Sequence, residues 1–75
     1  MRYHFHIREA ADVIADEEGA EFASLKAARA EARASLRDLV MEDLKNGRPS
    51  RAWCVDISTH DGTVLDCISL QLLEN

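Results

Sequence analysis

The chain has 75 residues, a formal net charge of −5 and 47% hydrophobic residues. A chain of this length is one small domain, residues 1–75, that buries only about 60% of its unfolded surface and has a small reserve of stability. Two cysteines without C-x-x-C spacing make neither a secreted disulfide framework nor a zinc knuckle. No apolar run reaches the roughly 20 residues that span a bilayer, and no signal-peptide core precedes the first strand. We therefore expect a cytoplasmic protein. We also expect a homodimer, because association can supply the stability that a small core lacks.

The first predicted element is a strand over residues 2–8, which read RYHFHIR. Strict alternation means that successive side chains point to opposite faces of a sheet. One face is apolar and predicts a core contact, and the other carries imidazole and guanidinium groups. The two faces are Tyr3, Phe5 and Ile7, and Arg2, His4, His6 and Arg8.

The segment 9–23 carries six acidic residues and no Lys or Arg. Val13 and Ile14 form a short apolar patch within it, which predicts a turn near 9–12 and a short strand at about 12–15. A loop follows, in which Gly19 is expected to supply a positive φ.

Residues 25–46 are expected to form one long helix. Ser24 is a suitable N-cap, Gly and Pro are absent until Gly47, and Pro49 prevents the helix from resuming. A stripe of apolar residues at helical spacing would face the sheet, and the small Ala28 and Ala32 within it would allow close packing. One flank of the helix is basic and the other is acidic.

Residues 52–58 and 63–70 predict a hairpin. A two-residue turn at Asp61-Gly62 would place Ile57 opposite Asp66, whereas a three-residue loop with Gly62 in the left-handed region would place Ile57 opposite Leu65. Since an unpaired buried carboxylate costs several kcal/mol, we favour the three-residue loop.

In that register Cys54 and Cys67 lie on opposite faces, which argues against a disulfide. Val64, Ile68 and Leu70 then share the second face with Cys54. A single helix covers only one face of a sheet, so an apolar strip stays uncovered and favours a partner.

The expected fold is α+β, with a small antiparallel sheet of three or four strands and one long helix packed on one face, in the order β-(β)-α-β-β. Its expected core is Tyr3, Phe5, Ile7, Leu25, Ala28, Ala32, Leu36, Leu39, Val40, Trp53, Val55, Ile57 and Leu65.

The combination of R-Y-H-F-H-I-R, D-E-E-G at 16–19, L-K-A-A-R-A-E-A at 25–32 and D-G at 61–62 resembles a family of short alphaproteobacterial, largely rhizobial, proteins that share a domain of unknown function. The likeness covers nearly the whole chain. It implies the fold and the compartment and carries no activity. A more distant likeness, over residues 2 to about 44, is to antitoxins with a partial ribonuclease-H-like sheet, and it concerns the fold alone.

No catalytic, cofactor or metal site is expected. His4 and His6 lack a third ligand and stand beside Arg2 and Arg8, which repel a cation. The serines lie outside any nucleophile motif, and no glycine-rich phosphate loop is present.

The sequence therefore favours a non-enzymatic protein-interaction module that acts as a homodimer. The alternative is an antitoxin-like regulator that binds a toxin or nucleic acid through the basic flank of the helix, although an acidic chain is a poor default binder of nucleic acid. The candidate partner-binding residues are His4, His6, Arg8, Arg29, Arg33, Arg37, Val64, Ile68 and Leu70.

Overall fold

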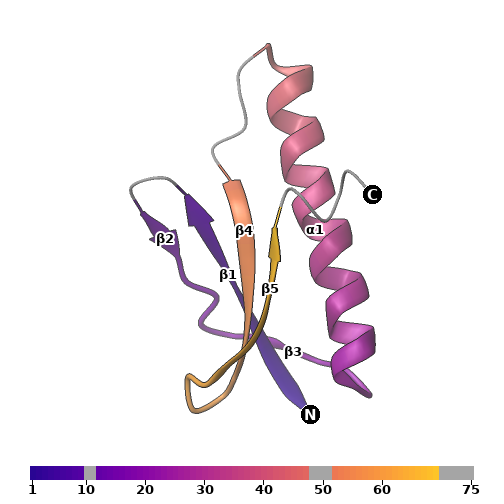
Figure 1. Ribbon diagram of the computed structural model, residues 1–75, viewed down its shortest axis with the longest axis vertical. Helices are drawn as coiled ribbons and strands as arrows, with labels where there is room; N and C mark the ends of the chain where they lie inside the picture. Colours follow the sequence, from indigo (N-terminus) through magenta and orange to yellow (C-terminus); the bar gives the residue numbers. More distant parts are fainter. Residues whose placement is uncertain (10–11, 48–51, 70–75) are drawn as a thin grey trace.

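The computed structural model describes residues 1–9, 12–47 and 52–69, without the side chains of Ala52 and Trp53. Its elements are β1 (Arg2–Glu9), β2 (Val13–Ile14), β3 (Ala20–Glu21), α1 (Leu25–Lys45), β4 (Ala52–Thr59) and β5 (Val64–Ser69). The strands form one antiparallel sheet in the order β2-β1-β4-β5, with β3 also paired to β1, and α1 lies across one side of it (Figure 1). The α+β class is confirmed. The prediction missed β3, a two-residue strand too short to leave an alternating pattern.

The β1–β4 pair is the middle of the sheet. Phe5 lies opposite Ile57 and Ile7 opposite Val55, so the apolar face of β1 continues into β4. Directly opposed residues of an antiparallel pair share a face, and this face is the one that α1 covers. The expected alternation of β1 is confirmed.

The helix begins and ends as its sequence predicts, within one residue at its C-terminal end. The Ser24 side chain accepts a hydrogen bond from the Ala27 N–H, and Gly47 follows the Asn46 C-cap with a φ of 73°. Ala28, Ala32 and Leu36 are fully buried against the sheet. Among the described residues, no helix has the length and apolar character needed to cross a membrane.

The β4–β5 hairpin has the expected loop and an unexpected register. The Gly62 N–H donates to the Thr59 carbonyl, the Thr59 N–H donates to the Thr63 carbonyl, and Gly62 has a φ of 93°, as a three-residue loop requires. Ser58 lies opposite Val64, but a bulge follows, and Ile57 then lies opposite Asp66.

The predicted pairing of Ile57 with Leu65 is therefore wrong, because the bulge places Leu65 outside the regular pairing. The carboxylate of Asp66 lies on the helix side but is not buried alone, since Arg29 of α1 pairs with it. The register prediction rested on the energetic cost of burying an unpaired carboxylate, and this cost does not arise because Asp66 is paired.

The bulge also changes which side chains share a face. Ile68 lies opposite Val55 and is 2% exposed, so it belongs to the core and not to the second face. Cys67 lies opposite Asp56, which puts it on the same face as Cys54 and contradicts the opposite-face prediction. Leu65, expected in the core, is 41% exposed.

The core lies between α1 and the sheet. Its buried members are Tyr3, Ala28, Ala32, Leu36, Val55, Ile57 and Ile68, and Phe5, Ile7, Phe22, Leu25, Leu39 and Val40 pack against them. Apart from Leu65, Ile68 and Phe22, this matches the prediction; the side chain of Trp53 lies outside the described residues.

Candidate functional site

The face of the sheet opposite α1, which we call the open face, is largely polar and gathers the chemically versatile side chains of the chain. Alternation and register place them there from three strands. They are His4, His6 and Arg8 of β1, Cys54, Asp56 and Ser58 of β4, and Cys67 of β5; the apolar Val64 lies on the same face, opposite Ser58.

His4 is buried beneath the loop that joins β2 to β3. Its Nδ1 donates a hydrogen bond to the carbonyl oxygen of Asp16 at 2.8 Å, and the residue is only 6% exposed. A ring nitrogen that donates at Nδ1 leaves a lone pair on Nε2 in the neutral form. That Nε2 is buried without a hydrogen-bond partner among the described residues, and the ring of His60 lies 5.6 Å away, centroid to centroid.

His6 is also held by hydrogen bonds. Its Nδ1 accepts from the Asp16 N–H at 3.0 Å, so its Nε2 carries the proton and donates to the Ser58 hydroxyl at 2.9 Å. Both ring nitrogens are therefore engaged. A two-histidine metal site at His4 and His6 would require these bonds to break.

Asp16 fastens the loop to β1 with both its backbone and its side chain. Its carboxylate accepts from the N–H groups of Phe5 and Gly19, each at 3.1 Å. Burial acts to raise the pKa of this carboxyl, but the two N–H donors and the charges of His4 and His6 outweigh it and hold the pKa below its ordinary value of 3.8.

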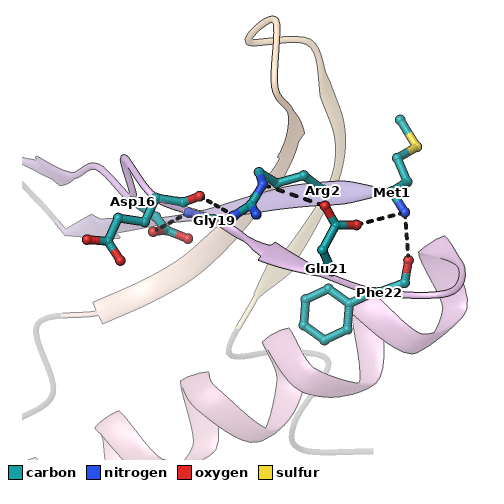
Figure 2. Close-up of polar contacts among 7 residues, drawn as sticks. Met1, Arg2, Asp16, Gly19, Glu21 and Phe22 are labelled. Atoms are coloured by element: carbon teal, nitrogen blue, oxygen red, sulfur yellow. Dashed lines mark hydrogen bonds and ion pairs between the residues drawn. The ribbon is translucent and has the colours of Figure 1, made fainter.

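The other end of the loop is tied down by Arg2. Figure 2 shows its guanidinium between Glu21 and the loop, where it donates to the Glu18 carbonyl at 2.7 Å and pairs with Glu21 at 3.6 Å. Position 19 of the loop requires glycine. Its φ is 71°, and a Cβ there would lie 2.7 Å from the Tyr3 carbonyl oxygen and 2.9 Å from Cε1 of His4.

Farther along the open face, two sulfurs and a carboxylate meet. The Sγ atoms of Cys54 and Cys67 and a carboxylate oxygen of Asp56 all lie within 4.8 Å of one another. Burial, together with Cys54 and Asp56 nearby, raises the pKa of the Cys67 thiol to about 12. Arg8 pairs with Asp56 at 3.6 Å.

The candidate residues predicted from the sequence fall into two separate groups. His4, His6, Arg8 and Val64 lie on the open face, whereas Arg29, Arg33 and Arg37 lie on α1. Arg29 is engaged by Asp66, Ile68 is buried in the core, and Leu70 lies outside the described residues.

Sequence reasoning missed three features of this face: the contacts of Asp16 with β1, the Ser58 partner of His6, and the Cys54–Asp56–Cys67 group. An Asp three residues before a glycine in a turn is a signal for the first. The last was hidden by the choice of register, since Cys67 reaches this face when Ile57 lies opposite Asp66 and not when it lies opposite Leu65.

The fold and this face define a small α+β domain whose histidines secure a loop. Residues 2–71 match a domain of unknown function, DUF6894, and the chain belongs to this family. No curated protein and no solved structure matches the chain. The resemblance to a domain of unknown function is confirmed, and the expectation of an alphaproteobacterial group stays a prediction.

Proposed function

We propose that the protein is a non-enzymatic interaction module that forms a homodimer through the outer edge of β5. The observation that carries this proposal is that one outer edge of the sheet is covered by further strands and the other is not. β2 and β3 cover the outer edge of β1, whereas β5 pairs only with β4 in the part of the chain that the structure describes. An uncovered edge strand presents N–H and C=O groups that a second strand can pair with.

The side chains of this edge favour a copy of the same chain as the partner. Val64 is 56% exposed and Leu65 is 41% exposed, which gives the edge an apolar end. Two copies of β5 can pair antiparallel about a two-fold axis perpendicular to the sheet, and such an isologous contact closes the assembly at two subunits.

This geometry makes a specific electrostatic prediction. Arg29 contacts Asp66 of β5, so the basic flank of α1 lies on the β5 side of the helix. The two-fold axis would place both helices on one side of the joined sheet, with Arg33 and Arg37 of each copy facing the other. Salt screens that repulsion, so the dimer should strengthen as the ionic strength rises.

The test is sedimentation equilibrium from micromolar to millimolar protein. Val64→Lys/Leu65→Lys places charges on the β5 edge, and Val13→Lys/Ile14→Lys places them on the opposite edge, where the exposures of 52% and 51% are comparable. We expect the first variant to be monomeric and the second to dimerise like the wild type. A wild type that is monomeric at every concentration, or an equal effect of the two variants, would overturn the proposal.

A second candidate rests on Arg33 and Arg37, which are exposed and make no ion pair with a described residue. These side chains could contact phosphates of nucleic acid or a toxin, in the manner of an antitoxin-like regulator. With Arg29 engaged by Asp66, only two arginines of the predicted three stay available. Binding of nucleic acid would weaken with salt, the opposite of the dimer, and its absence at about 50 mM salt would exclude the nucleic-acid version.

A further inference from the structure

Two cysteines and an aspartate form a compact donor set on the open face. Cys54 and Asp56 are two residues apart on β4 and point to the same side, and Cys67 lies opposite Asp56 on β5. Their ligand atoms all lie within 4.8 Å of one another. Ligand atoms around a tetrahedral zinc ion with Zn–S bonds of about 2.3 Å are roughly 3.8 Å apart, so small side-chain rotations would bring these donors to bonding distance.

The three donors are held by the paired strands of the sheet, and solvent reaches them from one side. β4 is paired on both edges, with β1 and with β5, so the two β4 donors are fixed by the ladders of the sheet. Cys54 is 6% exposed, whereas Cys67 is exposed and leaves a path for an ion. A preformed set of ligands on rigid strands loses little freedom when it binds.

The chemistry of the set selects the ligand. Two thiolates and one carboxylate carry three negative charges when deprotonated, and sulfur donors favour a thiophilic ion such as Zn²⁺ over Mg²⁺ or Ca²⁺. The ion would exchange places with the Arg8 guanidinium, which pairs with Asp56 at 3.6 Å and whose side chain is 50% exposed, so Arg8 can turn out into solvent.

We propose that Cys54, Asp56 and Cys67 bind a thiophilic divalent cation of the zinc type, with a fourth coordination position open on the solvent side. Binding releases the protons of the two thiols, so the affinity rises with pH. The site goes beyond the proposed dimer and does not depend on it, because its three ligands come from one chain.

Co²⁺ is the probe, added to the fully reduced protein, because thiolate ligation gives an intense charge-transfer absorption that carboxylate or imidazole ligation does not. We expect one cobalt per chain, with this band, and displacement by Zn²⁺. Cys54→Ser and Cys67→Ser should each weaken binding by more than the roughly 10–100-fold that loss of an outer-sphere group costs. Asp56→Asn should weaken it by at least about tenfold.

Glu42→Gln, which removes an exposed carboxylate of α1, is the matched control and should bind cobalt like the wild type. Circular dichroism of each metal-free variant checks that it folds. If a serine variant does not fold, native mass spectrometry of the wild type with and without alkylation of Cys67 replaces it, and alkylation should abolish the bound zinc. Absence of the charge-transfer band, retention of cobalt by both serine variants, or one metal per two chains would overturn the proposal.

Discussion

Gly19 is the residue at which the loop over His4 has least room. Its φ of 71° disfavours any side chain, and a Cβ would lie 2.7 Å from the Tyr3 carbonyl oxygen. Gly19→Ala should therefore lower the free energy of unfolding by about 3 kcal/mol, the sum of backbone strain and overpacking.

Gly47→Ala is the matched control, measured in the same urea titrations. Gly47 has a φ of 73°, but a Cβ there would meet no atom within 4 Å. The free energy of unfolding of this variant should therefore fall by only about 1 kcal/mol. If both variants lost the same free energy of unfolding, the close contact with Tyr3 and His4 would add nothing to the cost of backbone strain.

Asp16 should make stability depend on acid pH. Burial acts to raise its pKa, but hydrogen bonds from Phe5 and Gly19 and the nearby histidines hold the folded-state pKa below 3.8. A carboxyl with a lowered folded-state pKa stabilises the fold above its unfolded-state pKa and loses that effect as the pH falls through the folded-state value.

Asp16→Asn should accordingly cost about 1–2 kcal/mol of unfolding free energy at pH 7, because it removes charged acceptors of two backbone N–H groups. The difference from the wild type should persist down to about pH 5 and shrink below the ordinary pKa of 3.8. Urea titrations across this range measure it, with Glu17→Gln, an exposed carboxylate, as the control. A difference that does not change with pH would contradict the assigned role of the carboxylate.

At the scale of elements, the contact between α1 and the sheet depends on small residues. Ala28 and Ala32 are both 0% exposed, as their place in the apolar stripe predicts. Ala32→Leu should lower the free energy of unfolding by about 1–3 kcal/mol or more, because three extra carbons must enter a packed contact.

Ala34→Leu places the same side chain on the exposed side of α1 and should change stability by less than about 0.5 kcal/mol. Chemical denaturation of the two variants gives the comparison. A small loss at both positions would mean that the helix can move away from the sheet at little cost.

The hairpin shows where sequence reasoning succeeds and where it stops. The loop His60-Asp61-Gly62 follows from turn chemistry, and so does the first pair, Ser58 with Val64. The bulge at Leu65 has no local signal, since no glycine or proline marks it. It brings Asp66 to a distant partner, Arg29 of α1, and this ion pair becomes visible only once the helix is placed on the sheet.

The open face likewise combines local features that the sequence predicts with distant contacts that it does not. Alternation puts His4 and His6 together on it, because period two needs only neighbouring residues. The burial of His4 depends on Asp16, which lies 12 residues away in sequence and contacts the ring through a backbone carbonyl that carries no side-chain signature. The Cys54–Cys67 proximity follows from the pairing of Ile57 with Asp66, which the sequence offered only as the less favoured of two registers.

For the whole molecule, self-association should appear in thermal stability. A dimer that forms only from folded chains is favoured by mass action, so its melting temperature rises with protein concentration. We expect this rise for the wild type in calorimetry, and a melting temperature independent of concentration for Val64→Lys/Leu65→Lys. A wild-type melting temperature that does not change with concentration would contradict the homodimer.

The pairing of β1 with β4 also orders events during synthesis. β1 leaves the ribosome first, but its main partner lies in residues 52–59, about fifty residues later, so the middle of the sheet cannot close until that segment has emerged. In the interval α1 can form from local contacts alone, while the apolar face of β1 stays open. At roughly 5–20 residues per second, several seconds of synthesis therefore separate β1 from the strand that it pairs with, and α1 has time to form before the middle of the sheet does.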